Sequence, residues 1–191
     1  MATVHVTGGK EINQNLELQK DAMKSKVLAG MINAARLIKR AVTKVDLPTT
    51  PVDISNLRAS FFITTIIGIK AGASPTFLTE KGDSKLTPKQ FAELETHHAS
   101  SVATASAEVR TATNLTLIMG YGANYAIWVH EMTDPGVEWS KPGSGPKWFE
   151  KSLKGHRDDM LKEIGRSARI TQIKGFAATR TSAANTETEE V

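Results

Sequence analysis

The sequence predicts an α+β domain in which an antiparallel sheet of about four strands has helices on one face, a long N-terminal helix and a C-terminal helix. The predicted elements run strand, long helix, strand, inserted loop, hairpin and helix, which is neither regular βαβ alternation nor an all-β pattern. All three tryptophans fall within residues 128–148, so the large rings that dominate core energetics concentrate in one region. We therefore expect a single domain over residues 1–169, with a loop inserted at 71–105, and a polar extension over 170–191.

The first 48 residues predict a short strand and then the long helix. Val4 and Val6 alternate with polar residues over 3–7, and a Gly-Gly pair ends that strand. From Ile12 to Val42, apolar residues recur at three- and four-residue spacing, which is typical of an amphipathic helix. We expect the helix to end before Pro48, because proline lacks a backbone donor and disfavours helical geometry in the residue before it.

Residues 50–69 predict a short helix followed by a strand. Asp53 is placed to cap the helix through its carboxylate, and Leu57 and Phe61 are one turn apart on its inner side. The run FFITTIIGI, residues 61–69, is β-branched and aromatic, as expected of one buried strand.

Residues 71–105 change character, because glycine, proline and small polar residues interrupt them. We expect a surface excursion here, and a loop of this length is usually functional or mobile. Within it, Thr87 and Gln90 form a capping-box sequence with proline at the first helical position. This predicts a short helix over 87–98 with Phe91 and Leu94 directed inward.

The last third predicts a hairpin, a short element, a loop and a final helix. Two strands, 108–111 and 115–119, form the hairpin. Residues 125–132 would suit a strand but have helical spacing, and we predict a helix there; prolines and glycines then make 134–146 a loop. The inward face of the final helix carries Phe149, Leu153, His156, Met160 and Ile164. The residues expected in the core or at a subunit interface are Trp128, Trp139, Trp148, Phe149, Tyr125, Val4 and Val6.

Composition excludes several classes of site. The chain has no cysteine, so it has no disulfide framework, no thiolate metal site and no cysteine nucleophile. No apolar run approaches the roughly 20 residues of a membrane span, and we expect neither a signal peptide nor a membrane segment. Basic residues outnumber acidic ones along the first helix, and solvated lysines are the ordinary explanation of that excess. A nucleic-acid-binding protein is the alternative, and it would use Lys20, Lys24, Lys26, Arg36, Lys39 and Arg40.

No set of residues predicts catalysis, so we expect a protein that is not an enzyme and has no cofactor. His97 and His98 are adjacent and would point about 100° apart on a helix, which suits a solvated helix end rather than a metal site. His130, Glu131 and Asp134 match no zinc or nuclease spacing, so a metal-dependent hydrolase that uses these three residues is only a rival hypothesis. The glycine-rich run 142–146 lacks a phosphate-loop pattern, and the carboxylates over 158–163 are expected to pair with basic residues on a solvated helix face.

Three blocks of sequence, in this order, resemble one protein family. The first is VHVTGGKEINQNL, the second is Thr50-Pro51-Val52-Asp53 followed by Leu57-Arg58 and Ser60, and the third joins residues 125–131 to 146–150. Together they resemble the gene-product-ten-like neck or tail-completion proteins of tailed bacteriophages. The matched motif residues are Pro51, Asp53, Leu57, Arg58, Tyr125, Ala126 and Glu131. The chain departs from the family at Ile54-Ser55, where a Thr-Gly pair is usual, so the turn there is expected to be built differently.

The resemblance implies a structural virion protein at the joint between head and tail. It implies a homo-oligomer, a hexameric ring by analogy with tail symmetry, which surrounds the channel for genomic DNA. The implied neighbours are a portal-side adaptor or head-closure protein and the tail tube or tail terminator protein. The implied location is the neck of the virion, and the host cytoplasm during assembly, without a membrane.

Overall fold

The computed structural model describes residues 9–43, 50–51, 55–81, 84–134, 136, 139 and 144–169, and for 9–12 and 81–84 it describes no side chains. Several sequence predictions lie outside these residues: the strand over 3–7 with Val4 and Val6, the helix stop at Pro48, the cap at Asp53, much of the 134–146 loop and the extension over 170–191. The described part is an α+β fold with a three-stranded antiparallel sheet, a long N-terminal helix and C-terminal helices. At that level the predicted fold class is confirmed.

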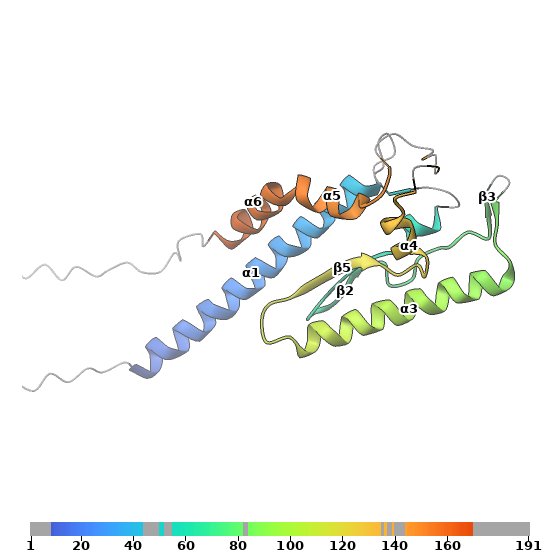
Figure 1. Cartoon of the computed structure of the whole chain (residues 1–191). Helices are drawn as coiled ribbons and strands as arrows, with labels where there is room; N and C mark the ends of the chain where they lie inside the picture. The colour runs from blue at the N-terminus through green and yellow to red at the C-terminus, as the bar shows by residue number, and fades with distance from the viewer. Residues whose placement is uncertain are drawn as a thin grey trace, which may run out of the picture.

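Helix α1, Gly9–Thr43, confirms the predicted long helix, and two C-terminal helices lie against its second half (Figure 1). These are α5, Trp148–Gly155, and α6, Arg157–Ala168. The prediction of one final helix was wrong, because the backbone leaves helical geometry at His156, with φ −109° and ψ 11°. The predicted inward face nevertheless holds on both sides of the break, where its members are half-buried. The buried apolar residues of α1 are Leu28, Ala34, Ala35, Ile38 and Val42.

The sheet consists of β1, Phe61–Thr65, β2, Gly68–Ala71, and β5, Leu117–Tyr121, in the order β2-β1-β5. The central strand β1 is buried along its whole length. The predicted single strand over 61–69 is therefore a hairpin that turns at exposed Ile66 and Ile67. Gly68 closes the turn at φ 102°, a conformation that a β-branched residue rarely adopts. The β-branched composition concealed this turn, because both isoleucines suit a strand.

Helix α3, Pro88–Thr111, overturns two predictions for the middle of the chain. Residues 88–105 of the predicted surface excursion belong instead to α3, which packs on β1 and β5 along one face of the sheet (Figure 1). Residues 108–111 are its last turn rather than a strand of a hairpin, and β5 pairs with β1 instead. The capping box is confirmed, because Thr87 Oγ1 accepts from Gln90 N at 3.3 Å and Thr87 N donates to Gln90 Oε1 at 2.9 Å. The buried residues of α3 are Leu94, His98, Val102, Ala105 and Val109.

Helices cover both faces of the sheet rather than one, as alternate residues of β1 demonstrate. Phe61 and Ile63 pack with Ala35 of α1, whereas Phe62 packs with Val102 and Ala105 of α3. A strand with helices on both sides has no solvent-facing row, so β1 begins with three apolar residues, and its buried Thr64 and Thr65 hydroxyls are hydrogen-bonded to Ser106 Oγ and Gly68 O. Two further short strands, β3, Glu80–Lys81, and β4, Ser84–Lys85, form a separate hairpin before α3.

Candidate functional site

Residues of the second and third sequence blocks meet in one buried cluster, which we call the motif junction. It is formed by α2, Asn56–Ala59, by α4, Ala126–Glu131, and by the start of α5. Leu57 and Trp148 are buried in it together with Leu94 and Ala123. Tyr125, Ala126, Val129 and Phe149 pack against these four residues. Two blocks that are far apart in sequence therefore share one core.

Trp148 is the central ring of the motif junction and is 2% exposed. Its ring centroid lies 4.5 Å from that of Tyr121 and 5.6 Å from that of His130, both in edge-to-face geometry. The indole Nε1 is buried without a hydrogen-bond partner among the described residues. Trp148 therefore contributes mainly through packing, as an aromatic anchor does.

A mostly apolar cavity of about 280 Å³ lies at the edge of the motif junction. Its lining residues are Pro51, Ser55, Asn56, Leu57, Leu86, Tyr125 and Val129. Ser55 has φ 77°, in the left-handed region, at the position where the resembling family has glycine. The Asn56 side chain fixes the turn, since its Nδ2 donates to Leu78 O at 2.8 Å and its Oδ1 accepts from Leu78 N at 2.7 Å. The turn is thus built with a serine and held by an asparagine.

The motif residue Arg58 lies beside the same core. Its Nε is buried with no hydrogen-bond partner in the described part of the chain, and burial lowers the pKa of the Arg58 guanidinium. Burial also raises the pKa of the nearby Tyr121 phenol, whose hydroxyl lies 2.9 Å from Thr50 Oγ1. Thr50 and Arg58, both from the second block, therefore contact or face Tyr121 at the end of β5.

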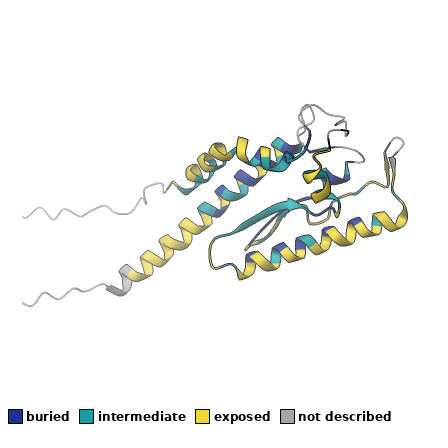
Figure 2. Cartoon of the chain, viewed as in Figure 1, coloured by how far each residue is buried: buried dark blue, intermediate teal, exposed yellow. Residues whose placement is uncertain are grey.

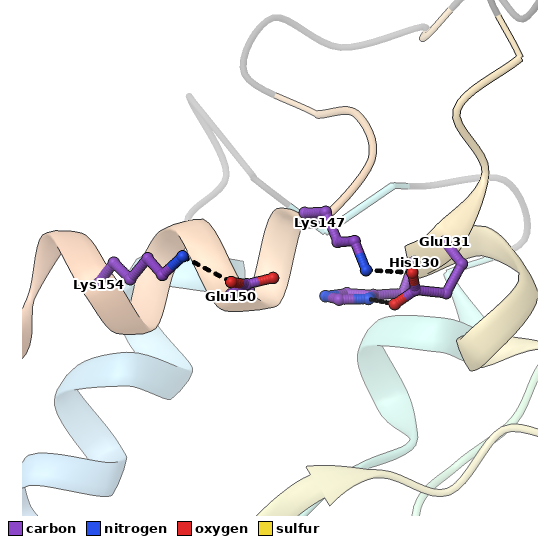
Figure 3. Close-up of polar contacts among 5 residues, drawn as sticks. All are labelled: His130, Glu131, Lys147, Glu150 and Lys154. Carbon is purple, nitrogen blue, oxygen red and sulfur yellow. Dashed lines mark hydrogen bonds and ion pairs between the residues drawn. The ribbon is translucent and has the colours of Figure 1, made fainter.

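A polar network on the surface ties α4 to α5 (Figure 3). The Glu131 carboxylate binds Lys147 Nζ and lies 2.8 Å from His130 Nδ1, and Lys147 N donates to His130 O at 2.7 Å. Lys147 first, and then His130, hold the pKa of the Glu131 carboxyl below its usual range. A second pair, Glu150 with Lys154 at 2.6 Å, follows on α5 and lowers the pKa of Glu150 in the same way. The motif residue Glu131 thus positions the start of α5.

The structure brings no metal site together around His130. Glu131 is engaged by a lysine, and the described residues contain no group of three histidine, aspartate or glutamate side chains able to hold a metal ion. The carboxylates of α6 pair along the helix, Asp159 with Lys162 at 3.4 Å and Glu163 with Arg166 at 2.8 Å. Ion pairing on a solvated helix face accounts for them, as predicted.

The three tryptophans occupy different environments. Trp148 belongs to the core, Trp139 is half-buried, and Trp128 is 73% exposed on the outer face of α4 beside exposed Ile127. The role of Trp128 at a subunit interface stays a prediction.

His98, expected at a solvated helix end, is instead 2% exposed in the middle of α3. Its Nε2 lies 2.8 Å from Gly72 O, and because a carbonyl oxygen accepts, this nitrogen carries the proton. The ring packs edge-on against Phe62 and Phe77, with centroid distances of 6.2 and 5.5 Å. The spacing of Leu94, His98 and Val102 was the available signal, and it was missed because the helix was expected to end at residue 98.

The basic residues of α1 do not gather in one continuous stripe. Lys20 pairs with Glu17 at 2.9 Å, Lys24 pairs with Asp21 at 3.7 Å, and Lys39 lies over the Phe61 ring. A depression of about 360 Å³ between α1 and α6 is lined by Asn33, Arg36, Leu37, Arg40, Glu163 and Arg166. Arg36 and Arg40 lie together in this lining, where Arg166 is paired with Glu163.

Comparisons of the chain with protein-family models, with curated proteins and with solved structures find no match. Among the described residues, no helix is long and apolar enough to cross a membrane.

Proposed function

We propose that this chain is a structural subunit of a tailed-bacteriophage neck, in which identical copies form a ring that completes the tail or joins it to the DNA-filled head. The observation that carries the proposal is the motif junction. Leu57 of the second block and Trp148 of the third are buried in the same cluster, with Tyr125 and Val129 packed against them. Short sequence matches gain weight when their residues build one structural unit, because a shared core is a reason for them to occur together.

The one departure from the family pattern also supports the proposal. Ser55 stands where glycine is usual, and its backbone has φ 77°. Glycine adopts positive φ without steric cost, whereas other residues do so rarely. The backbone therefore keeps the conformation that a family glycine would favour.

Exposed apolar side chains supply surfaces for a ring. Ile127 and Trp128 project from α4, and Ile67 and Ile69 are exposed at the β1–β2 hairpin. A ring built by head-to-tail contact needs two different, complementary surfaces on each subunit. In the described sheet, β2 and β5 are also outer strands, to which a neighbouring strand could add. The proposed ring has six copies. Its neighbours are the portal-side adaptor or head-closure protein and the tail tube or tail terminator protein, and DNA passes through its lumen.

The proposal is tested by light scattering and electron microscopy of the purified protein, alone and then with isolated tails or DNA-filled heads. We expect a ring, either in solution or only at one end of a particle. Trp128→Ser should weaken ring formation or particle binding without unfolding the protein, whereas Leu161→Ser, at an exposed position on α6, should act as the control. A wild-type protein that forms no ring and binds neither particle contradicts the proposal.

Nucleic-acid binding is the second candidate, and the arginine-lined depression between α1 and α6 favours it. Binding through phosphates weakens steeply as salt rises, because neutralised phosphates release counterions. Arg36→Gln with Arg40→Gln should reduce both affinity and salt dependence in a DNA-binding assay. Lys20→Gln with Lys24→Gln is the matched control, because these lysines are already paired with acidic neighbours.

A further inference from the structure

The two halves of α1 differ in what covers them. In the second half, α6 lies so close that a Cβ added to Gly30 would be 2.8 Å from Ile164 Cα and 2.9 Å from Ser167 Cβ. In the first half, residues 13–25 are all exposed, and the helix projects from the body (Figure 2). Helix α6 ends at Ala168, so its contact with α1 does not extend along this bare half.

Two exposed apolar side chains, which we call the bare stripe, nevertheless continue the covered face along the bare half, with Gln19 between them on that face. Leu16 and Met23, which are 56% and 45% exposed, are two turns apart on one face of the helix. At three- and four-residue spacing this face runs on through Val27 to Gly30, where α6 covers it. The bare stripe is thus a direct continuation of the α1–α6 interface. Leu16 and Gly30 are roughly 21 Å apart along the axis, at the rise of an α-helix.

Charged residues beside the stripe indicate the partner. Glu17, Lys20, Asp21 and Lys24 lie on one flank and alternate in sign along the helix. From Glu17 to Lys24 the charges are negative, positive, negative and positive. An antiparallel copy presents them in the reverse order, so each charge meets the opposite sign. In an antiparallel helix pair related by a two-fold axis, the same flank of each helix faces its counterpart.

We infer that the first half of α1 is a self-association surface, where a second copy of this chain pairs antiparallel around a two-fold axis between residues 20 and 21. In that pair Glu17 faces Lys24 of the partner subunit, and Leu16 and Met23 lose their exposure to water. Burial of the stripe and the opposite charges beside it both stabilise the pair. A helix with no tertiary contacts is marginal in water, so pairing also stabilises the projecting half of α1.

This contact is separate from the neck proposal. A ring at one end of a tail uses head-to-tail contacts, whereas the α1 pair is isologous and closes with two copies. The α1 pair forms between free subunits and does not depend on any phage particle.

The test is sedimentation velocity over a range of protein concentrations, with a matched set of variants. We expect the wild type to reach the mass of two chains as concentration rises, and Leu16→Glu with Met23→Glu to stay at one chain over the same range. Leu18→Glu is the control, because Leu18 is 69% exposed but lies about 200° around the helix from Leu16. A wild-type monomer at every concentration overturns the inference and leaves residues 170–191 or a different protein as the occupant. A dimer that survives the double substitution also overturns it.

Charge exchange and cross-linking test the antiparallel geometry. Glu17→Lys with Asp21→Lys should weaken the dimer, and adding Lys20→Glu with Lys24→Glu should restore it, because the reversed order is again self-complementary.

The chain has no cysteine, so cross-links between introduced thiols report the distance between the substituted positions directly. Lys20→Cys should cross-link through a short bifunctional reagent, whereas Glu17→Cys should do so only when mixed with Lys24→Cys, because two copies of position 17 are about 10 Å apart along the axis. Equal cross-linking by Glu17→Cys and Lys20→Cys alone contradicts the antiparallel arrangement.

Discussion

The two halves of α1 have the same apolar periodicity and opposite environments. Ile38 and Val42 in the second half are fully buried, whereas Leu16 and Met23 in the first half face solvent. Periodicity therefore identifies the face of a helix that is suited to burial, but not whether this chain itself covers that face. Substitutions at Ile38, His98, Gly30 and Glu131 extend this contrast between covered and exposed side chains, from the largest expected effect to the smallest.

Ile38→Ala should destabilise the fold by about 2–5 kcal/mol, because it removes a fully buried side chain and leaves a cavity. Leu16→Ala should change the free energy of unfolding by less than about 0.5 kcal/mol at concentrations where the protein is a monomer. Urea unfolding followed by circular dichroism measures both. Equal losses would mean that the first half of α1 is packed within the monomer.

His98→Ala should cost about 2–3 kcal/mol, because it removes the hydrogen bond to Gly72 O together with the ring that packs on Phe62 and Phe77. His97→Ala, one residue earlier on the exposed side of α3, should cost less than about 0.5 kcal/mol. The same urea titration separates the two variants. Similar values would contradict the burial of His98.

Gly30→Ala should destabilise by about 1–3 kcal/mol, since its Cβ would press on the backbone of α6 at Ile164 and force the helices apart. Gly165→Ala is the matched control on α6, because no atom lies within 4 Å of the added Cβ. The control should be neutral or slightly stabilising, as alanine favours helix over glycine. Thermal unfolding of the two variants gives the comparison, and a stable Gly30→Ala protein would contradict the close α1–α6 contact.

Glu131→Gln should change the free energy of unfolding least of the four, and only at pH values where the Glu131 carboxylate of the wild type is ionised. The pKa of Glu131 is lowered in the folded protein by Lys147 and then His130, so its stabilising contribution is complete above the ordinary carboxyl pKa of about 4.3. That contribution is lost as pH falls below this value through the lowered folded pKa. Stability measured from pH 7 to pH 2 should therefore fall less steeply for Glu131→Gln than for the wild type. Parallel curves would show that the Lys147 contact does not form in solution.

The sequence correctly predicted those elements that a local residue pattern specifies. It gave wrong bounds for the elements whose extent depends on tertiary contacts. Helix α1 and the capping box at Thr87 carry strong local patterns, and both are confirmed. Helix α3 was truncated in the prediction because its serine- and alanine-rich second half resembles a polar loop, whereas small residues there allow Val102 and Ala105 to reach the sheet. The turn at Ile66 and Ile67 was missed because isoleucine is typical of strands, so the two exposed turn residues were predicted to continue the strand.

The candidate site divides in the same way. The aromatic concentration correctly indicated a core around Trp148, but it gave no reason to separate Trp148 from exposed Trp128. Burial of each ring depends on which side of α4 or α5 meets Leu57 and Leu94, and those contacts span most of the chain. The partners of Glu131 were also hidden, because Lys147 approaches it from across a proline- and glycine-rich loop.

Electron microscopy of the protein mixed with DNA-filled heads and with isolated tails tests the proposed function most directly. The neck proposal predicts a ring of this protein at the single head-tail joint of one of the two particles, coaxial with the DNA channel. A protein that decorates neither particle, and that binds free DNA with steep salt dependence through Arg36 and Arg40, would contradict it.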